Sequence, residues 1–196
     1  MNTHGRHCLL FILIGIVVLI ILGVDFSTHS LYAQNSLHSG HVTNNTISKY
    51  TGQENRIIKS LSPEDIESLQ TGTGDAFGGM AKLAELNGYP GPRHVLDLAN
   101  ELELSNRQKE NITTIYDNMK NKSVELGQEI LNVEKIANEE FINKTITDSQ
   151  MKQLIFKSSE IYGQLRYAHL STHLKMLTIL TPEQVNLYNN LRGYSP

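Results

Sequence analysis

Two histidines, His169 and His173, stand four residues apart in a stretch whose apolar pattern predicts a helix. Residues at i and i+4 lie one turn apart on the same helix face, so both imidazoles can point at one metal ion. Among divalent ions, Zn, Cu and Ni are those that imidazole nitrogens bind well. A pair of histidines is only half of a metal site, and the alternative is that both merely flank a packed face.

A third metal ligand would have to come from another part of the chain. If the long helices form a hairpin that turns near residue 145, Asp117 lies close to the level of His173. His94, which follows the turn at Tyr89-Pro90-Gly91-Pro92, is the other candidate. The predicted site therefore contains His169, His173, His94 and Asp117. It would hold Zn or another divalent transition metal, and no cofactor is required.

The elements that position these residues are marked by repeated helix-start signals. Three segments share one pattern, a hydroxyl residue followed three positions later by Gln: Leu104-Ser105-Asn106-Arg107-Gln108, Ile146-Thr147-Asp148-Ser149-Gln150 and Leu180-Thr181-Pro182-Glu183-Gln184. In this capping box the hydroxyl accepts from the N–H three residues on, while Gln reaches back to the N–H of the cap. Three boxes predict three helix N-termini. A fourth, shorter helix should begin at Ser62-Pro63 and end near Gln70.

The apolar spacing behind the first two boxes predicts an all-α fold built on a long antiparallel helical hairpin with short flanking helices. Small or apolar residues alternate by three and four from Ile112 to Ala137 and again from Met151 to Ile179, as core-facing seams do. The first helix should span about 35 residues. A link of about five residues, at 143–147, forces the two helices to run antiparallel.

A second apolar stripe, Leu170, Leu174 and Leu177, faces away from the seam of the second long helix. One hairpin cannot bury both faces, so the stripe requires the helix predicted at His94–Glu103, the helix predicted at Pro182–Leu191, or a second subunit. Together with Tyr188 and Leu191 it forms the predicted surface for a client protein or a dimer partner.

The chain divides into three parts on composition. Residues 1–33 read as a signal peptide or N-terminal membrane anchor, because Arg6 and His7 precede the uncharged apolar run Leu9–Val24. Cleavage and retention both remain open. Residues 34–56 are predicted to be a flexible linker, and residues 57–196 a helical domain with a Gly/Pro-rich loop at 71–92, where six of the fourteen glycines fall between Gly72 and Gly91.

Several function classes find no support in this composition. The single cysteine, Cys8, lies in the targeting segment, so the predicted mature chain has no thiol for disulfides, metal binding or catalysis. The net charge of −3 provides no basic field for nucleic acid. No nucleophile elbow, zinc-protease, P-loop or dinucleotide motif occurs, and the sequence therefore predicts that the protein is not an enzyme.

The paired boxes at Leu102–Gln108 and Leu180–Gln184, which bracket a long helical hairpin, resemble the LTXXQ family of Spy- and CpxP-like periplasmic chaperones and zinc resistance-associated proteins. The likeness covers about residues 96–194. It implies an exported, stress-related protein, with a homodimeric cradle of helices in the chaperones and metal binding in the resistance branch. The Gly-rich insert at 72–92 and the lack of strong positive charge depart from this pattern.

Taken together, these features predict an extracytoplasmic helical binding protein, located in the periplasm or at the cell surface. It would be a homodimer that binds unfolded or stress-exposed proteins in a chaperone-like way. It would contact the membrane only through an uncleaved N-terminal segment. The alternatives are a divalent-metal binding or sensing protein of the zinc resistance-associated type and a non-catalytic envelope scaffold.

Overall fold

A computed structural model describes residues 47–194 of the chain. The predicted signal or anchor segment, 1–33, and most of the predicted linker, 34–56, lie outside the described residues. The first ten described residues, 47–56, form turns and one 3-10 helix, η1 (Gln53–Asn55). None of the helices in the described range is both long enough and apolar enough to cross a membrane.

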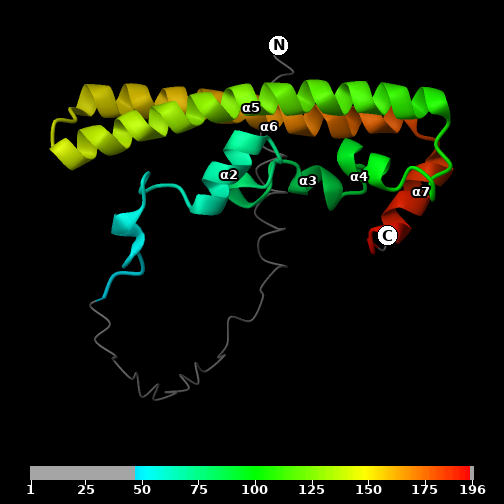
Figure 1. Ribbon diagram of the computed structural model, residues 1–196, viewed down its shortest axis with the longest axis horizontal. Helices are drawn as coiled ribbons and strands as arrows, with labels where there is room; N and C mark the ends of the chain where they lie inside the picture. Colours follow the sequence, from blue (N-terminus) through cyan, green and yellow to red (C-terminus); the bar gives the residue numbers. More distant parts are fainter. Residues whose placement is uncertain (1–46, 195–196) are drawn as a thin grey trace, which may run out of the picture. The chain divides into compact units, whose positions relative to one another are not determined.

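The described residues are helical and contain no strand, which confirms the predicted all-α class. Two long helices, α5 (Asn106–Asn143) and α6 (Asp148–Ile179), lie side by side along most of their length (Figure 1). The shorter elements pack along one side of this pair: α2 (Pro63–Thr71), η2 (Ala76–Gly78), α3 (Lys82–Glu85), α4 (Pro92–Asp97) and α7 (Pro182–Leu191).

The helix starts and the hairpin seam agree with the sequence analysis. Ser105, Thr147 and Thr181 each cap a helix, with both hydrogen bonds of the capping box formed, and Ser62 does the same for α2. The α5 and α6 positions assigned to the seam are buried or half-buried, and four residues join the two helices. The short link and the matched apolar faces therefore fix an antiparallel hairpin.

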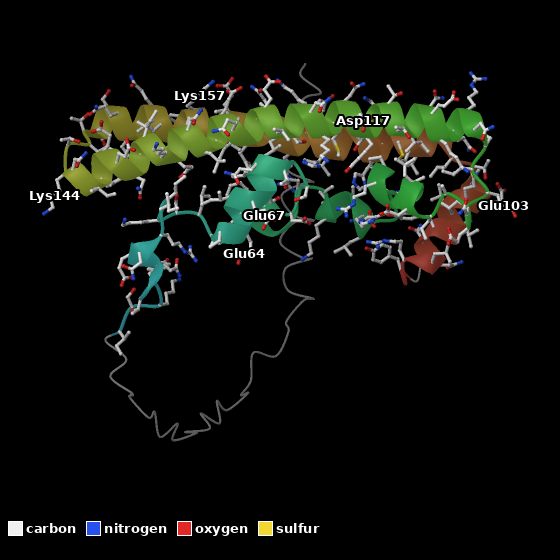
Figure 2. The ribbon with its side chains drawn as sticks, in the orientation of Figure 1. Glu64, Glu67, Glu103, Asp117, Lys144 and Lys157 are labelled. Atoms are coloured by element: carbon white, nitrogen blue, oxygen red, sulfur yellow. The ribbon has the colours of Figure 1, made fainter. Side chains whose placement is uncertain are left out.

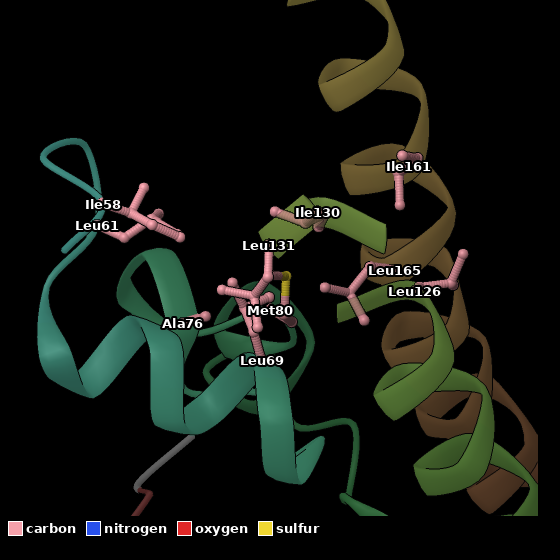
Figure 3. Close-up of a cluster of buried hydrophobic side chains, with 10 residues drawn as sticks. All are labelled: Ile58, Leu61, Leu69, Ala76, Met80, Leu126, Ile130, Leu131, Ile161 and Leu165. Carbon is pink, nitrogen blue, oxygen red and sulfur yellow. The ribbon is translucent and has the colours of Figure 1, made fainter. Parts of the chain in front are cut away.

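The hairpin core is completed by α2, which lies on α5 at Gly127. A Cβ built on Gly127 would clash with the carbonyl oxygen of Leu69, so only glycine allows this approach. One buried cluster joins the three helices with the chain before and after α2 (Figure 3): Ile58, Leu61, Leu69, Ala76, Met80, Leu126, Ile130, Leu131, Ile161 and Leu165.

The Gly/Pro-rich segment differs from the plain loop expected at 71–92. It contains η2 and α3, and it buries Ala76 and Met80 in the hairpin core. We call residues 72–91 the strap, because they run along the hairpin from the end of α2 to the start of α4.

The helix predicted at His94–Glu103 is also different: α4 begins at Pro92, which suits a first turn, and ends at Asp97. Turns then continue to Glu103, which has a positive φ of 49°.

The helices α4 and α7 close the open end of the hairpin. The bounds of α7 confirm the predicted range, Pro182–Leu191. A second buried cluster joins them to the hairpin: Val95, Leu102, Leu104, Ile112, Met176, Leu180 and Tyr188. The capping glutamines of α5 and α7 also bond to each other, with Gln108 Nε2 donating to Gln184 Oε1 at 2.8 Å. Gln184 Nε2 donates in turn to the carbonyl of Leu102 at 3.0 Å. The two boxes therefore fasten one helix start to the other.

The contact of α2 with Gly127 can be tested with a matched pair of substitutions. Glycine to alanine within a helix usually stabilises by about 1 kcal/mol, and Gly163→Ala on α6 should do so because its Cβ would meet nothing within 4 Å. Gly127→Ala should instead lower the free energy of unfolding by about 2 kcal/mol or more, because Leu69 must move away. Urea unfolding followed by circular dichroism measures both; stabilisation by both variants would contradict the contact.

Candidate functional site

His169 and His173 lie on the α6 face that the strap covers, and both are buried, with exposed fractions of 5% and 6%. Glycines let the strap backbone approach the two rings. A Cβ on Gly74, where φ is +85°, would stand 2.7 Å from Cε1 of His169, and one on Gly91 would stand 3.1 Å from Cε1 of His173. The strap glycines are therefore required for a backbone that packs directly on two imidazoles.

His169 is held as a neutral imidazole. Its Nε2 lies 3.1 Å from Ser123 Oγ, on the facing helix α5. Burial, and to a lesser extent the nearby His173, lowers the pKa of His169 to about 4, while Asp75 acts weakly in the opposite direction. Since the ring stays uncharged at neutral pH, its role in the fold is to form a buried polar contact between the two long helices.

His173 joins α6 to the far end of the strap. Its Nδ1 lies 2.7 Å from the carbonyl oxygen of Tyr89. A carbonyl only accepts hydrogen bonds, so Nδ1 carries a proton and donates it to Tyr89. The same Nδ1 is 4.0 Å from Oε2 of Glu85.

Glu85, at the end of α3, is the best-connected acidic residue of the site. Its Oε1 accepts hydrogen bonds from the hydroxyl of Tyr188 at 2.7 Å, from Arg192 Nε at 3.2 Å and from the hydroxyl of Tyr194 at 3.4 Å. Tyr188 in turn accepts from the N–H of Gly91 at 3.3 Å. Burial and the bond to Glu85 raise the pKa of Tyr188, so the phenol stays protonated and continues to donate.

Between the strap and the hairpin lies a cleft of about 400 Å³. We call it the histidine cleft, since His94, His169 and His173 all line it. Five strap glycines line it: Gly72, Gly74, Gly78, Gly79 and Gly91. The charged lining side chains are Asp75, Lys82, Glu85, Arg93 and Arg192. A volume of this size suits a small ligand.

Three of the four predicted metal ligands, His94, His169 and His173, line the histidine cleft, and Asp117 does not. Successive helix residues point about 100° apart, and the α5 seam turns Tyr116 into the cleft, which leaves Asp117 exposed. Figure 2 labels Asp117 on α5. Within residues 47–194, no three His, Cys, Asp or Glu side chains are close enough together to hold a metal ion. Binding of Zn or another divalent ion remains a prediction.

The predicted client or dimer surface is partly present. Leu174 is 59% exposed, Leu177 41% and Leu191 46%, while Leu170 is half-buried. Tyr188, by contrast, is fully buried, so its assignment to this surface is wrong. The ring fills the core beneath α7, and the hydroxyl is used by Glu85 and Gly91.

Sequence reasoning missed Glu85, Lys82, Arg93 and Arg192. The first two lie on α3, within the segment predicted to be a Gly/Pro-rich loop, and the two arginines lie near the start of α4 and directly after α7. The available signal was the density of strap glycines, since glycine is needed where backbone approaches another group closely. That signal predicts a close approach but does not say which side chains are approached.

The buried neutral state of His169 predicts a pH-dependent stability. Its folded pKa of about 4 lies below the unfolded value of 6.5, so the unfolded chain binds the proton more readily. The contribution of neutral His169 to the free energy of unfolding is complete above pH 6.5. It is lost as the pH falls towards about 4, and the total loss is roughly 3 kcal/mol. Urea unfolding at about pH 7.5 and about pH 4.5 measures this loss. His169→Gln, which cannot titrate, should show a smaller fall; an equal fall would refute the assignment.

Removing the Tyr188 hydroxyl should loosen the attachment of α7. Tyr188→Phe keeps the buried ring but removes the shortest of the three hydrogen bonds to Glu85 and leaves the N–H of Gly91 without its acceptor. We expect the free energy of unfolding to fall by about 1–3 kcal/mol. Tyr167→Phe, at a ring that is 72% exposed, is the control and should stay within about 0.5 kcal/mol of the native chain. Equal effects in thermal or urea unfolding would show that the hydroxyl contributes nothing.

Comparisons with protein-family models, with curated proteins and with solved structures found no match to this chain. The resemblance to the LTXXQ family therefore rests on the residues of the two boxes and on the hairpin that they bracket.

Proposed function

We propose that this chain is an exported, non-enzymatic binding protein that holds exposed apolar segments of unfolded or stress-damaged proteins. The observation that carries the proposal is the uncovered apolar stripe of α6, formed by Leu170, Leu174 and Leu177. Spacings of four and three residues put these side chains on one helix face. Leu174 and Leu177 are exposed and Leu170 is half-buried, and neighbouring apolar side chains on one face indicate a binding surface more strongly than scattered ones do.

Neither of the chain's own helices that were expected to cover the stripe does so. Both α4 and α7 pack at the open end of the hairpin, yet Leu174 and Leu177 remain exposed. Leu187 on α7 is also 40% exposed, and Leu191 adds to the apolar surface of that helix. The remaining occupants are a client protein or a second copy of the chain. We favour a client, because the hairpin with its two boxes resembles a chaperone family.

The resemblance extends the proposal to location and assembly. A signal-like N-terminus and a thiol-free domain favour a location in the periplasm or at the cell surface. A Spy/CpxP-like cradle would be a homodimer, in which the hairpins of two copies share one concave surface. A dimer that formed through the α6 stripe itself would compete with client binding. A non-catalytic envelope scaffold would use neither the concave surface nor the stripe to bind clients.

Metal binding is the second candidate function, favoured by the presence of His94, His169 and His173 around one cleft. The hydrogen bonds limit it: His169 uses Nε2 towards Ser123, and His173 uses Nδ1 towards Tyr89. The remaining ring nitrogens lie beside the strap backbone at Gly74 and Gly91. A metal would therefore need the strap to move, which gives this function less support than client binding.

The client proposal predicts that Leu174→Ser with Leu177→Ser reduces suppression of aggregation several-fold. The two side chains are exposed, so the variant should keep its helical circular dichroism and melting temperature. The measurement is light scattering of a chemically unfolded model protein diluted into buffer with the chain, with and without chelator. Retained activity in chelator separates client binding from a metal-dependent function.

A matched control lies near the closed end of the hairpin, at Ile155 and Phe156, which are 57% and 64% exposed. These positions precede Leu174 by 19 and 18 residues on the same helix, or roughly 28 Å along its axis. Ile155→Ser with Phe156→Ser should leave suppression intact. If both variants lost suppression of aggregation equally, the activity would come from general surface hydrophobicity and not from the stripe. If the Leu174/Leu177 variant changed from dimer to monomer in sedimentation, the stripe would be a self-association surface.

A further inference from the structure

We propose that the histidine cleft is a binding site for a small anion, of the phosphate or dicarboxylate class. This ligand site is separate from the apolar stripe of α6, and none of the three stripe residues lines the cleft.

Basic side chains from three elements meet at the cleft although the whole chain carries a net charge of −3. Lys82 comes from α3, Arg93 from α4, and Arg192 follows α7 directly. Within the described part of the chain, no carboxylate lies within ion-pair distance of Lys82. Arg93 has only a long, exposed pair with Asp97, at 4.0 Å. Exposed pairs of this kind contribute little, so both cations are available to a ligand.

The two acidic residues of the cleft do not cancel this charge. Glu85 is already occupied by two tyrosine hydroxyls and by Arg192, with His173 close by. A carboxylate that accepts several charge-assisted hydrogen bonds repels a neighbouring anion much less than a bare one does. Asp75 is exposed, so water screens its charge. The side chains left to interact with a ligand are therefore mainly cationic.

The strap leaves room in the cleft for an oxyanion. Glycines with a positive φ angle, Gly72, Gly74, Gly78 and Gly79, line the cleft without adding a side chain to it. The N–H groups of Gly72 and Gly79 already donate to the carbonyls of Ser68 and Ala76, so the donors that remain for a ligand are mainly the cationic side chains. The rings of His169 and His173 also line the cleft, and each has one nitrogen within hydrogen-bonding distance of a protein atom, Ser123 Oγ and the carbonyl oxygen of Tyr89 respectively.

The experiment titrates the full chain with inorganic phosphate and, separately, with succinate, using calorimetry and thermal unfolding. We expect at least one of the two anions to bind and to raise the melting temperature by linkage. Lys82→Ala with Arg93→Ala should weaken binding at least tenfold. In histidine ring NMR, the signals of His169 and His173 should shift with added anion, which places the ligand in this cleft. The relative affinities of the two probes distinguish a phosphate site from a carboxylate site.

The matched control removes two lysines from the hairpin end that is far from α3 and α4, Lys144→Ala with Lys157→Ala (Figure 2). This variant loses the same net charge and should keep full affinity. Equal weakening in both variants would show non-specific attraction and overturn the proposal. So would the absence of any binding at concentrations of about 10 mM, or binding of Zn²⁺ alone that depends on His169 and His173.

Discussion

The carboxylate of Glu85 is the interaction on which the arrangement of the strap, the histidine face and α7 depends. Its side chain is only 13% exposed, and moving a carboxylate away from water costs several kcal/mol unless hydrogen bonds replace the lost hydration. Tyr188, Arg192 and Tyr194 provide those hydrogen bonds, and all three belong to the C-terminal segment. Glu85 therefore holds the C-terminal segment against the hairpin. The N–H of Gly91 bonds to the hydroxyl of Tyr188, and the strap carbonyl of Tyr89 accepts from His173 of α6.

Glycine is the second constraint, and it acts differently in the strap and in α5. At Gly127 the missing side chain allows the backbone of α2 to lie on α5, which completes a purely apolar core. At Gly74 and Gly91 it brings the strap backbone onto two imidazoles, where the result is a polar cleft. Glycine weakens a helix by up to about 1 kcal/mol relative to alanine, so its presence within α5 is offset by the packing of α2.

The long elements could be predicted from sequence because their signals are local. A capping box needs only four consecutive residues, and the seam from Ile112 to Ala137 repeats over several turns, so each identifies its own helix. The strap could not be predicted in the same way. Its short helices α3 and η2 are stabilised by long-range contacts such as Met80 in the core and Glu85 with Tyr188, which are 103 residues apart. Contacts at that separation leave no periodic pattern in one sequence.

The same difference explains the outcome for individual site residues. His169 and His173 were found because i, i+4 spacing is a local signal, but their partners, Ser123 and the carbonyl of Tyr89, depend on how the helices and strap meet. Tyr188 was assigned to the surface because its neighbours Leu187 and Leu191 are apolar and are in fact exposed. On α7 it is the one position that turns fully towards the second core cluster. Composition alone does not distinguish the two faces of so short a helix.

The fold also allows the two proposed activities to be separated on one helix. On α6 the histidine pair and the Leu170, Leu174 and Leu177 stripe point about a quarter of a turn apart, because each residue rotates the helix face by about 100°. The strap covers the histidine face through Gly74 and Gly91, while Leu174 and Leu177 remain in contact with water. Polar substitutions in the stripe therefore leave the cleft lining unchanged, and substitutions at Lys82 and Arg93 leave the stripe unchanged. Since each set of variants removes side chains from one surface alone, a loss of binding in one set can be assigned to that surface.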